Sequence, residues 1–409
     1  MKDILKPLFF VVFLDLLGVS ILIPILGPLF LNTNLIFPST ISVGYRTILL
    51  GLLIAAYPLA QFFGAPLLGA LSDRYGRKKI LLISLTGTLV GYLLFGLGLI
   101  ISNLPLLFFS RALDGLTGGN ISVALSAIAD TSDERSKAKN FGLIGMAFGL
   151  GFIMGPFIGG KLADPHVVSW FNFATPLWFA AILSLFNIIL VWKRFDETLK
   201  TTIESPISLL TGFRNIKRAA EMKSLRTMFF VIFMLSFGFS FFTQFFQVFL
   251  IEKFHYSQGD IGDLFAFVGF FIALTQGVIT RIAAKYLQPE QVMYFSPVGL
   301  AIALPLLLVP SRSANMFFVL PFIALFQGLT YPNSTAVISN LADKKSQGEI
   351  LGINQSLQSL AMSIPPIIAG FIVSFHMNLP IMVASICTFI AWGIFMGFFT
   401  HGKKKFHEI

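Results

Sequence analysis

Charged residues are scarce in this chain, and their scarcity excludes an ordinary soluble fold. Asp, Glu, Lys and Arg make up 12% of the 409 residues, whereas a soluble globular chain carries about 25%. Hydrophobic residues reach 56%, and Phe alone contributes 47 of them. This composition leaves too little charge to cover a water-facing surface. The chain is therefore predicted to be an integral membrane protein.

Cysteine and metal-binding patterns are equally scarce. The single cysteine, Cys387, excludes an internal disulfide and a Cys-rich metal site. The sequence holds no zinc-protease signature, nucleophile elbow or Cys/His constellation. Gly155-x-x-x-x-Gly160-Lys161 matches part of a phosphate-binding loop, but Leu162 replaces the required Ser or Thr. We expect no metal, no cofactor and no enzymatic activity.

Long apolar stretches dominate what is present. Many reach about 18–25 residues, enough to cross a hydrocarbon core of about 30 Å. Backbone groups in lipid must be satisfied within their own segment, so these stretches are predicted to be helices. The expected fold is an all-α polytopic membrane protein with 12 transmembrane helices, at residues 5–31, 46–71, 80–102, 105–129, 139–163, 173–194, 223–250, 260–284, 291–309, 313–340, 348–375 and 379–401. The first stretch is too long for a signal-peptide core, so we expect it to be a retained span.

The longest polar stretch, residues 195–222, divides the chain near its middle. It is predicted to be a cytoplasmic linker between an N-terminal six-helix bundle (1–194) and a C-terminal one (223–401), with a cytoplasmic tail at 402–409. With both termini in the cytoplasm, 24 of the 29 Lys and Arg residues fall on that side of the membrane and four on the other. This positive-inside bias fixes the orientation. It also accounts for the net charge of +10 without a nucleic-acid partner.

The two halves repeat each other. Asp114-Gly-Leu-Thr aligns with Gln327-Gly-Leu-Thr at an offset of 213 residues, and the same offset pairs Gly64 with Gly277. An ordered series of such matches indicates an internal repeat of six spans. Transporters built from such repeats bind their substrate between the two bundles, near the middle of the membrane.

The loop after the second span carries the most specific motif. A positive-inside loop explains its basic residues, but not their order. The order resembles the cytoplasmic signature motif of the major facilitator superfamily, and the resemblance extends over the whole chain. The motif reads Gly69-Ala-Leu-Ser-Asp73-Arg74-Tyr-Gly76-Arg77-Lys-Lys.

The resemblance implies two contacts of this loop. Asp73 is a carboxylate suited to a helix N-terminus, and the helix implied here is the eleventh span, which starts near Gly348. Arg77 is then placed to pair with Asp130 at the end of the fourth span. We expect these contacts to latch the two halves in the outward-open state.

The fifth span is rich in small residues. Close helix packing alone explains small residues that lie four apart. Their order also resembles the antiporter motif of drug:proton antiporters in this superfamily, and the resemblance favours exchange over symport. The motif residues are Gly151, Gly155, Pro156, Gly159 and Gly160.

Three ionisable residues, Asp15, Arg111 and Asp114, interrupt the apolar spans of the first half. Charges inside a span are costly and usually functional. Arg111 matches the arginine of the superfamily's span-four motif, and Asp114 can share its helix face. Asp15 lies in a segment resembling the first span of tetracycline-type antiporters, and a desolvated carboxylate there can load and release a proton. The alternatives are a structural ion pair and a helix-packing aspartate, and whether Asp15 or Asp114 carries the proton stays open.

The second half lacks an intramembrane ion pair and offers amides and aromatic rings instead. Each amide alone can be helix–helix glue, but together with Phe they suit an amphipathic organic ligand. With Gln61 of the second span, the expected substrate-lining residues are Gln244, Gln247, Gln327, Asn354, Gln358, Phe241 and Phe245. The acidic residues Glu252, Asp260 and Asp263 are expected to be solvated helix ends near the outer membrane face.

Two departures bear on the substrate. The third span has no carboxylate, where tetracycline exporters of the family carry one, and the eighth span has no histidine. The resemblance therefore supports the wider drug-exporter family rather than tetracycline as the substrate.

We expect a monomeric secondary transporter in a bacterial inner membrane that exchanges protons for small amphipathic compounds. The alternatives are a transporter of one metabolite or siderophore with the same fold, and a membrane receptor that does not transport.

Overall fold

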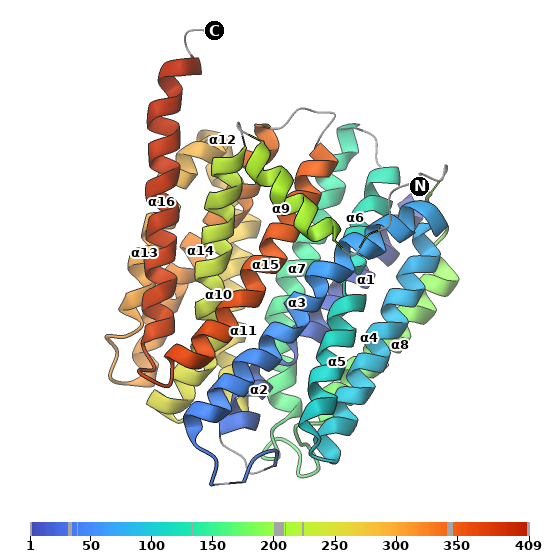
Figure 1. Cartoon of the computed structure of the whole chain (residues 1–409), viewed down its shortest axis with the longest axis vertical. Coiled ribbons are helices and arrows are strands. Elements are labelled where there is room, and N and C mark those ends of the chain that lie inside the picture. The colour runs from blue at the N-terminus through green and yellow to red at the C-terminus, as the bar shows by residue number, and fades with distance from the viewer. Residues whose placement is uncertain are drawn as a thin grey trace. The chain divides into compact units, whose positions relative to one another are not determined.

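The computed structural model describes residues 2–31, 35–38, 40–131, 134–199, 208, 210–222, 225–341 and 347–406. These residues form helices and turns without a β-strand (Figure 1), which confirms the predicted all-α class. The chain divides into two compact units, each described here by itself. Unit 1 comprises Met1–Gly212 and His255–Phe267, and unit 2 comprises Phe213–Phe254 and Val268–Ile409. The boundary at Gly212 falls inside the predicted linker, and the predicted bundle limits stay a prediction.

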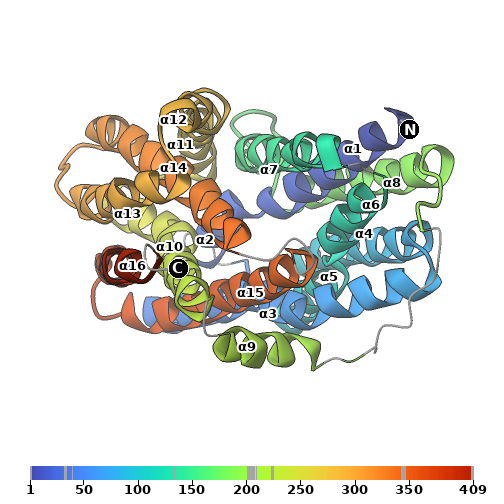
Figure 2. The same cartoon turned by 90° about the horizontal axis from the view of Figure 1, so that it is seen from above.

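The helices of unit 1 follow the apolar stretches of the sequence. They are α1 (Lys2–Ser20), α2 (Ile23–Leu31), α3 (Val43–Tyr75), α4 (Arg77–Ile100), α5 (Leu104–Thr117), α6 (Asn120–Thr131), α7 (Glu134–Leu162), α8 (Thr175–Arg194) and the first turns of α11 (Gln258–Leu274). Figure 2 shows α1 against α7 and α8, and α4 against α5 and α8. A buried apolar cluster that includes Leu8, Val12, Leu81 and Val123 joins these helices.

Three of the expected spans, the first, the fourth and the eighth, are each divided into two helices, the eighth by a π-helical turn at Thr275–Ile279. The first span breaks between Ser20 and Ile23, directly before Pro24, which lies in the first turn of α2, where proline is tolerated. The fourth span breaks at Gly118 and the glycine after it, residues that cost the most backbone entropy in a helix. This second break places irregular backbone one turn after Asp114.

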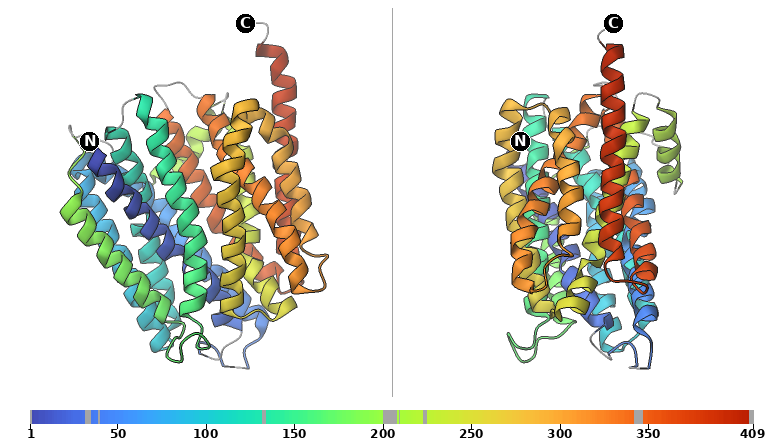
Figure 3. Two further views of the ribbon diagram at one scale, coloured as in Figure 1. Left: turned by 180° about the vertical axis from the view of Figure 1, so that it is seen from behind. Right: turned by 90° about the vertical axis from the view of Figure 1, so that its left-hand side faces the viewer.

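The helices of unit 2 are long and rich in Phe. They are α9 (Thr211–Glu221), α10 (Arg226–Phe254), the remainder of α11, the π-helical turn η1 (Thr275–Ile279), α12 (Thr280–Tyr286), α13 (Pro289–Leu306), the 3₁₀ turn η2 (Ser313–Asn315), α14 (Met316–Asn340), α15 (Gln347–Ile372) and α16 (Leu379–Phe406). Within the unit, α10 packs against α15 and α16, and α13 packs against α14 and α16 (Figure 3). Phe229, Ile232, Ile353 and Phe395 belong to its buried core.

Eight helical stretches of the described chain are long and apolar enough to cross a membrane. They are Leu5–Leu31, Val43–Tyr75, Arg77–Ile100, Thr175–Arg194, Arg226–Phe254, Gln258–Tyr286, Ser313–Asn340 and Leu379–Phe399. Each overlaps one of the expected spans. The other four expected spans correspond to α5 with α6, α7, α13 and α15, and their crossing of the membrane stays a prediction.

Candidate functional site

Two of the predicted ionisable residues form a buried ion pair on α5. Arg111 Nη1 lies 3.2 Å from Asp114 Oδ2, and the two side chains are 8% and 3% exposed. Their spacing of three residues places them on one helix face, as predicted. The Arg111 guanidinium also lies over the ring of Tyr57 on α3, 4.6 Å from the ring centroid. This cation–π contact holds the cation from a second side.

Small residues and one amide bring α3 close enough to α5 for this contact. A Cβ atom on Gly115 would overlap the carbonyl oxygen of Tyr57, so only glycine permits the approach. Gln61, one turn after Tyr57, donates from Nε2 to the carbonyl oxygen of Gly118 at 2.9 Å. The Gln61 amide, predicted to line the substrate site, therefore satisfies a carbonyl at the break between α5 and α6.

Asp15 of α1 is buried near this pair but is not part of it. The residue is 4% exposed, and neither carboxylate oxygen accepts a hydrogen bond from the described residues. The Asn120 side chain of α6 and the Asp114 carboxylate lie near it. A buried carboxylate without a partner is costly as an anion, and a bound proton removes that cost. In the described chain the Arg111 cation pairs with Asp114 rather than with Asp15.

The structure adds three polar residues to this site that the sequence did not identify. Asn120 begins α6, and Thr88 and Tyr92 lie one turn apart on α4; side-chain polar atoms of all three are buried without a hydrogen-bond partner in the described chain. The Tyr92 ring lies against Gly18 of α1, where a Cβ atom would come 2.5 Å from the hydroxyl oxygen. Most buried polar groups in proteins are hydrogen-bonded. Such a concentration of unsatisfied groups around Asp15 and Asp114 is typical of a functional site. The only sequence signal was a Thr and a Tyr four residues apart in an apolar helix.

The signature loop forms a second cluster of ions at one end of unit 1. The Arg77 guanidinium is buried, contacts the Asp73 carboxylate through Nη1, and places Nε 3.0 Å from Asp130 Oδ2. The predicted pair of Arg77 with Asp130 is therefore present. Gly76 has a φ of +99°, a conformation that side-chain-bearing residues rarely adopt. Arg74 extends outward over the Tyr75 ring.

Glu197, which follows α8, completes this cluster and was not predicted. Its carboxylate accepts hydrogen bonds from the backbone N–H groups of Arg77 at 2.9 Å and Lys78 at 3.1 Å. These groups form the N-terminus of α4, which favours an anion through its dipole and its free N–H groups. The start of the predicted linker is thus bound to the signature loop. The expected contact of Asp73 with the helix near Gly348 would join the two units, and it stays a prediction.

The antiporter-motif glycines of α7 form its contact surface with the first span. A Cβ atom on Gly155 would overlap the Ser20 hydroxyl, and one on Gly159 would overlap the carbonyl oxygen of Ile21. Ser20 also donates to the carbonyl oxygen of Gly151 at 2.9 Å. The packing interpretation of these glycines is therefore confirmed. The antiport interpretation is compatible with the packing and stays a prediction.

The far end of α7 meets the start of α11 within unit 1. Lys161 Nζ lies 2.7 Å from Asp263 Oδ2, and the Asp263 side chain is 49% exposed, so Asp263 is a solvated helix end that also pairs with Lys161. The sequence could not show this, because its partner lies 102 residues away along the chain. Gly160 faces Gly262 closely enough that a Cβ atom would come 3.0 Å from the Gly262 Cα. Gln258 donates to the carbonyl oxygen of Ala163 at 3.2 Å.

The predicted substrate-lining residues of unit 2 lie on three helices. Gln244, Gln247, Phe241 and Phe245 are on α10, Gln327 is on α14, and Asn354 and Gln358 are on α15. The Gln327 and Asn354 side-chain oxygens are buried and accept no hydrogen bond from described residues. Phe241 and Phe245 are each 1% exposed. Unsatisfied amide acceptors and aromatic rings can orient an amphipathic ligand, and the role of these residues stays a prediction.

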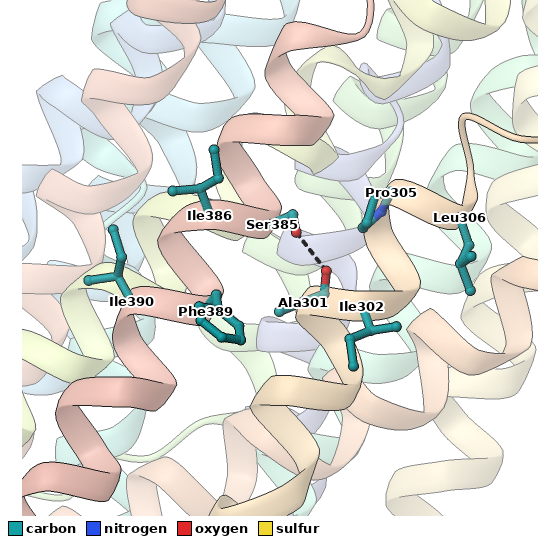
Figure 4. Close-up of a pocket in the computed structure, with 8 residues that line it drawn as sticks. All are labelled: Ala301, Ile302, Pro305, Leu306, Ser385, Ile386, Phe389 and Ile390. Atoms are coloured by element: carbon teal, nitrogen blue, oxygen red, sulfur yellow. Dashed lines mark hydrogen bonds between the residues drawn. The ribbon is translucent and has the colours of Figure 1, made fainter.

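An open apolar groove of about 470 Å³ lies elsewhere, between α13 and α16. Ile302, Leu306, Ile386, Phe389 and Ile390 line it and are largely exposed. Ser385 donates its hydroxyl to the carbonyl oxygen of Ala301 at 2.6 Å (Figure 4), so the one polar side chain is already satisfied. The groove contains none of the predicted substrate residues. Its composition suits contact with lipid chains rather than recognition of a polar solute.

Similar proteins support a transport function. The Major Facilitator Superfamily model matches residues 8–366 and 228–407. The chain is 30% identical over 368 residues to the class E tetracycline resistance protein of Escherichia coli, covering 89% of this chain and 86% of that protein. It is 28% identical over 382 residues to the quinolone resistance protein NorA of Staphylococcus aureus (strain Mu50 / ATCC 700699), covering 92% of each.

Solved structures share the same fold. A human organic anion transporter, MFSD10, aligns with a TM-score of 0.74 at 21% identity over 96% of this chain and 99% of its own. A D-xylose-proton symporter aligns with the same TM-score at 16% identity over 96% of both chains. The charge-poor apolar helices and the match to relatives along almost the whole chain lead to one conclusion. The chain belongs to the Major Facilitator Superfamily and is a multi-pass membrane transporter of small molecules, not an enzyme.

Proposed function

We propose that this transporter is a proton-coupled antiporter, which exports small amphipathic organic compounds across a bacterial inner membrane by alternating access. The observation that carries the proposal is Asp15, a buried carboxylate without a hydrogen-bond partner among the described residues, beside the Arg111–Asp114 ion pair. A carboxylate in this setting gains more from binding a proton than one in water. The likeness to two drug-resistance proteins supports export as the direction.

Asp15 and Asp114 have different roles in this proposal. Asp15 takes up the proton, because the Arg111 cation is paired with Asp114 rather than with Asp15. While Asp15 holds the proton, Asp114 is paired with Arg111. When the proton leaves, the Asp15 anion draws the Arg111 guanidinium away from Asp114, and the rearranged pair couples proton release to helix movement. Which acidic residue carries the proton is decided by separate Asn substitutions.

Two clusters at opposite ends of unit 1 act as gates in this proposal. The cytoplasmic one joins Arg77 to Asp73 and Asp130. The outer one joins Lys161 to Asp263 and brings Gly160 onto Gly262. Both sets of contacts are formed in this structure, and in this proposal alternating access opens them one at a time. With the signature loop in the cytoplasm, both chain termini also lie there, and the monomer is the transporting unit.

Proteoliposome transport with an internal pH dye tests the function. The test set includes tetracyclines and quinolones, the drug classes named for two relatives, together with sugars, organic acids and siderophores. We expect amphipathic drugs to drive a pH change that the other compounds do not. A pH change driven by one metabolite alone would favour the specific-transporter alternative. Transport of a drug without any pH change would contradict proton coupling, and no transport of any compound would favour the receptor.

A further inference from the structure

The helix α9 lies in the linker between the halves, and one face of it packs against the rest of unit 2. Ile216 and Ala219 pack into the apolar core of unit 2 with Leu225 and Met228. Asn215 donates from Nδ2 to the Ser356 hydroxyl of α15 at 2.9 Å. Figure 2 shows α9 on the outside of α15. The amphipathic pattern of the helix is thus explained on one side by packing, and the opposite side needs a separate explanation.

The outward face of α9 combines apolar and basic side chains. Leu210 and Phe213 are 58% and 51% exposed, although burial of each would gain free energy. Arg214, Lys217 and Arg218 are exposed on the same helix. Glu221 is the one acidic residue in the sequence of α9, and it lies 3.8 Å from Lys217. A helix face with large apolar residues and an excess of Lys and Arg is typical of contact with an anionic membrane surface.

The chain keeps α9 close to the bilayer. It ends at Glu221, and the membrane-crossing helix α10 begins at Arg226. Five residue steps span about 18 Å at most, so the basic face cannot move far from the headgroups. The positive-inside bias of the Lys and Arg residues puts this linker on the cytoplasmic side. The cytoplasmic leaflet carries anionic lipids that attract juxtamembrane basic segments.

We propose that the outward face of α9 binds the anionic headgroups of the cytoplasmic leaflet. Phe213 and Leu210 enter the boundary between headgroups and acyl chains. Arg214, Lys217 and Arg218 bind the lipid phosphates. Because Asn215 ties α9 to α15, lipid binding also restrains the end of the helix that carries Asn354. The proposal depends on the orientation of the chain and not on proton coupling or on the identity of the transported compound.

Site-directed spin labelling tests this placement directly. The single cysteine makes it simple: Cys387→Ser removes the native thiol, and Phe213→Cys provides one label site on α9. Full-length protein is reconstituted in phosphatidylcholine with or without phosphatidylglycerol, and label contact with oxygen and with a water-soluble nickel complex is measured. Each basic residue near an anionic surface adds roughly a fivefold preference. We expect the oxygen-to-nickel ratio to rise at least about threefold with phosphatidylglycerol.

Three comparisons make the result specific. The triple substitution Arg214→Gln, Lys217→Gln and Arg218→Gln should abolish the rise. The control pair Lys193→Gln and Arg194→Gln, at the end of α8, should preserve it. Raising the salt to about 1 M shortens the screening length to about 3 Å. High salt should therefore also abolish the rise, and this test needs no substitution on the basic face. The outcome then does not depend on whether the triple variant folds. Equal ratios in both lipid mixtures would overturn the proposal and leave this face bare or reserved for a cytoplasmic protein.

Discussion

The two units carry the two copies of the sequence repeat but differ in their buried chemistry. Unit 1 buries Asp15 and the Arg111–Asp114 pair. At the repeat position of Asp114 unit 2 has Gln327, and at that of Arg111 it has Ala324. No ion pair is described within the membrane-crossing helices of unit 2, whose unsatisfied polar groups include the neutral Gln327 and Asn354. A buried charge is costly wherever it has no task, and the difference supports the proposal that unit 1 handles the proton.

The signature loop shows the same asymmetry. In unit 1 it places Arg77 among two carboxylates and binds Glu197 through the start of α4. The corresponding stretch of unit 2, Arg281 to Lys285, lies on α12 and exposes both basic residues. Removing an exposed cation costs little free energy, whereas removing a buried cation leaves its carboxylate partners unpaired and costs more. In the proposed mechanism the cytoplasmic gate is therefore built mainly by unit 1.

The largest expected effect on transport comes from removing the Asp15 carboxylate of unit 1. Asp15→Asn is expected to lower proton-driven drug export about 100-fold or more, the range found when a proton-transferring group is lost. The measurement is the export rate in proteoliposomes under an imposed pH gradient. Asp196→Asn, an exposed residue after α8, is the matched control and should keep the rate. Equal export by the Asp15 variant and the control would break the assignment of proton handling to unit 1.

The second effect concerns stability rather than rate. Arg111→Gln leaves Asp114 buried without its cation and is expected to lower the free energy of unfolding by about 3–5 kcal/mol. Adding Asp114→Asn should restore much of that loss, because the unpaired charge is then gone. Thermal unfolding of the two single variants and the double variant measures this coupling. Additive losses would show that the two side chains do not act as a pair.

The third effect compares the two versions of the signature loop. Arg77→Gln removes the cation that Asp73 and Asp130 share, and transport is expected to slow about tenfold, since a hydrogen bond to a charged group is worth about 1.5–3 kcal/mol. Arg281→Gln at the exposed position of unit 2 should leave the rate nearly unchanged. Initial transport rates at saturating substrate provide the test. A similar loss in both variants would make the gate symmetric.

The smallest expected effect tests the proposed substrate-binding role of unit 2. Asn354→Ala is expected to raise KM for the exported compound a few-fold, because one hydrogen bond contributes about 0.5–1.5 kcal/mol. Proton release per transported molecule should stay at the wild-type value. Export kinetics and the pH dye, recorded together, separate the two quantities. A changed proton ratio with unchanged KM would place Asn354 in the proton path instead.

The sequence predicted what depends on local spacing or on family motifs. Arg111 and Asp114 are three residues apart on one helix, so their pairing followed from helix geometry. Arg77 and Asp130 are 53 residues apart, and only the resemblance to a known family connected them. The all-α class followed from composition, because lipid leaves the backbone few other choices.

The residues that the sequence missed are joined by tertiary contacts without a periodic signal. Asn120 lies near Asp15 on a separate helix, and the Tyr92 ring of α4 lies against Gly18 of α1. Glu197 acts from a loop, 120 residues along the chain from the backbone N–H of Arg77 that it binds. The breaks after Ser20 and at Gly118 were also missed, since hydropathy over a long apolar stretch does not register a local change in backbone direction.

Proton release on substrate binding tests the central claim most directly. Purified protein in weakly buffered detergent solution is mixed with an exported drug, and the pH change is followed with a dye. The account predicts that the wild type releases protons into the solution and that Asp15→Asn releases none while still binding the drug. An Asp15→Asn protein that releases as many protons as the wild type would contradict the account.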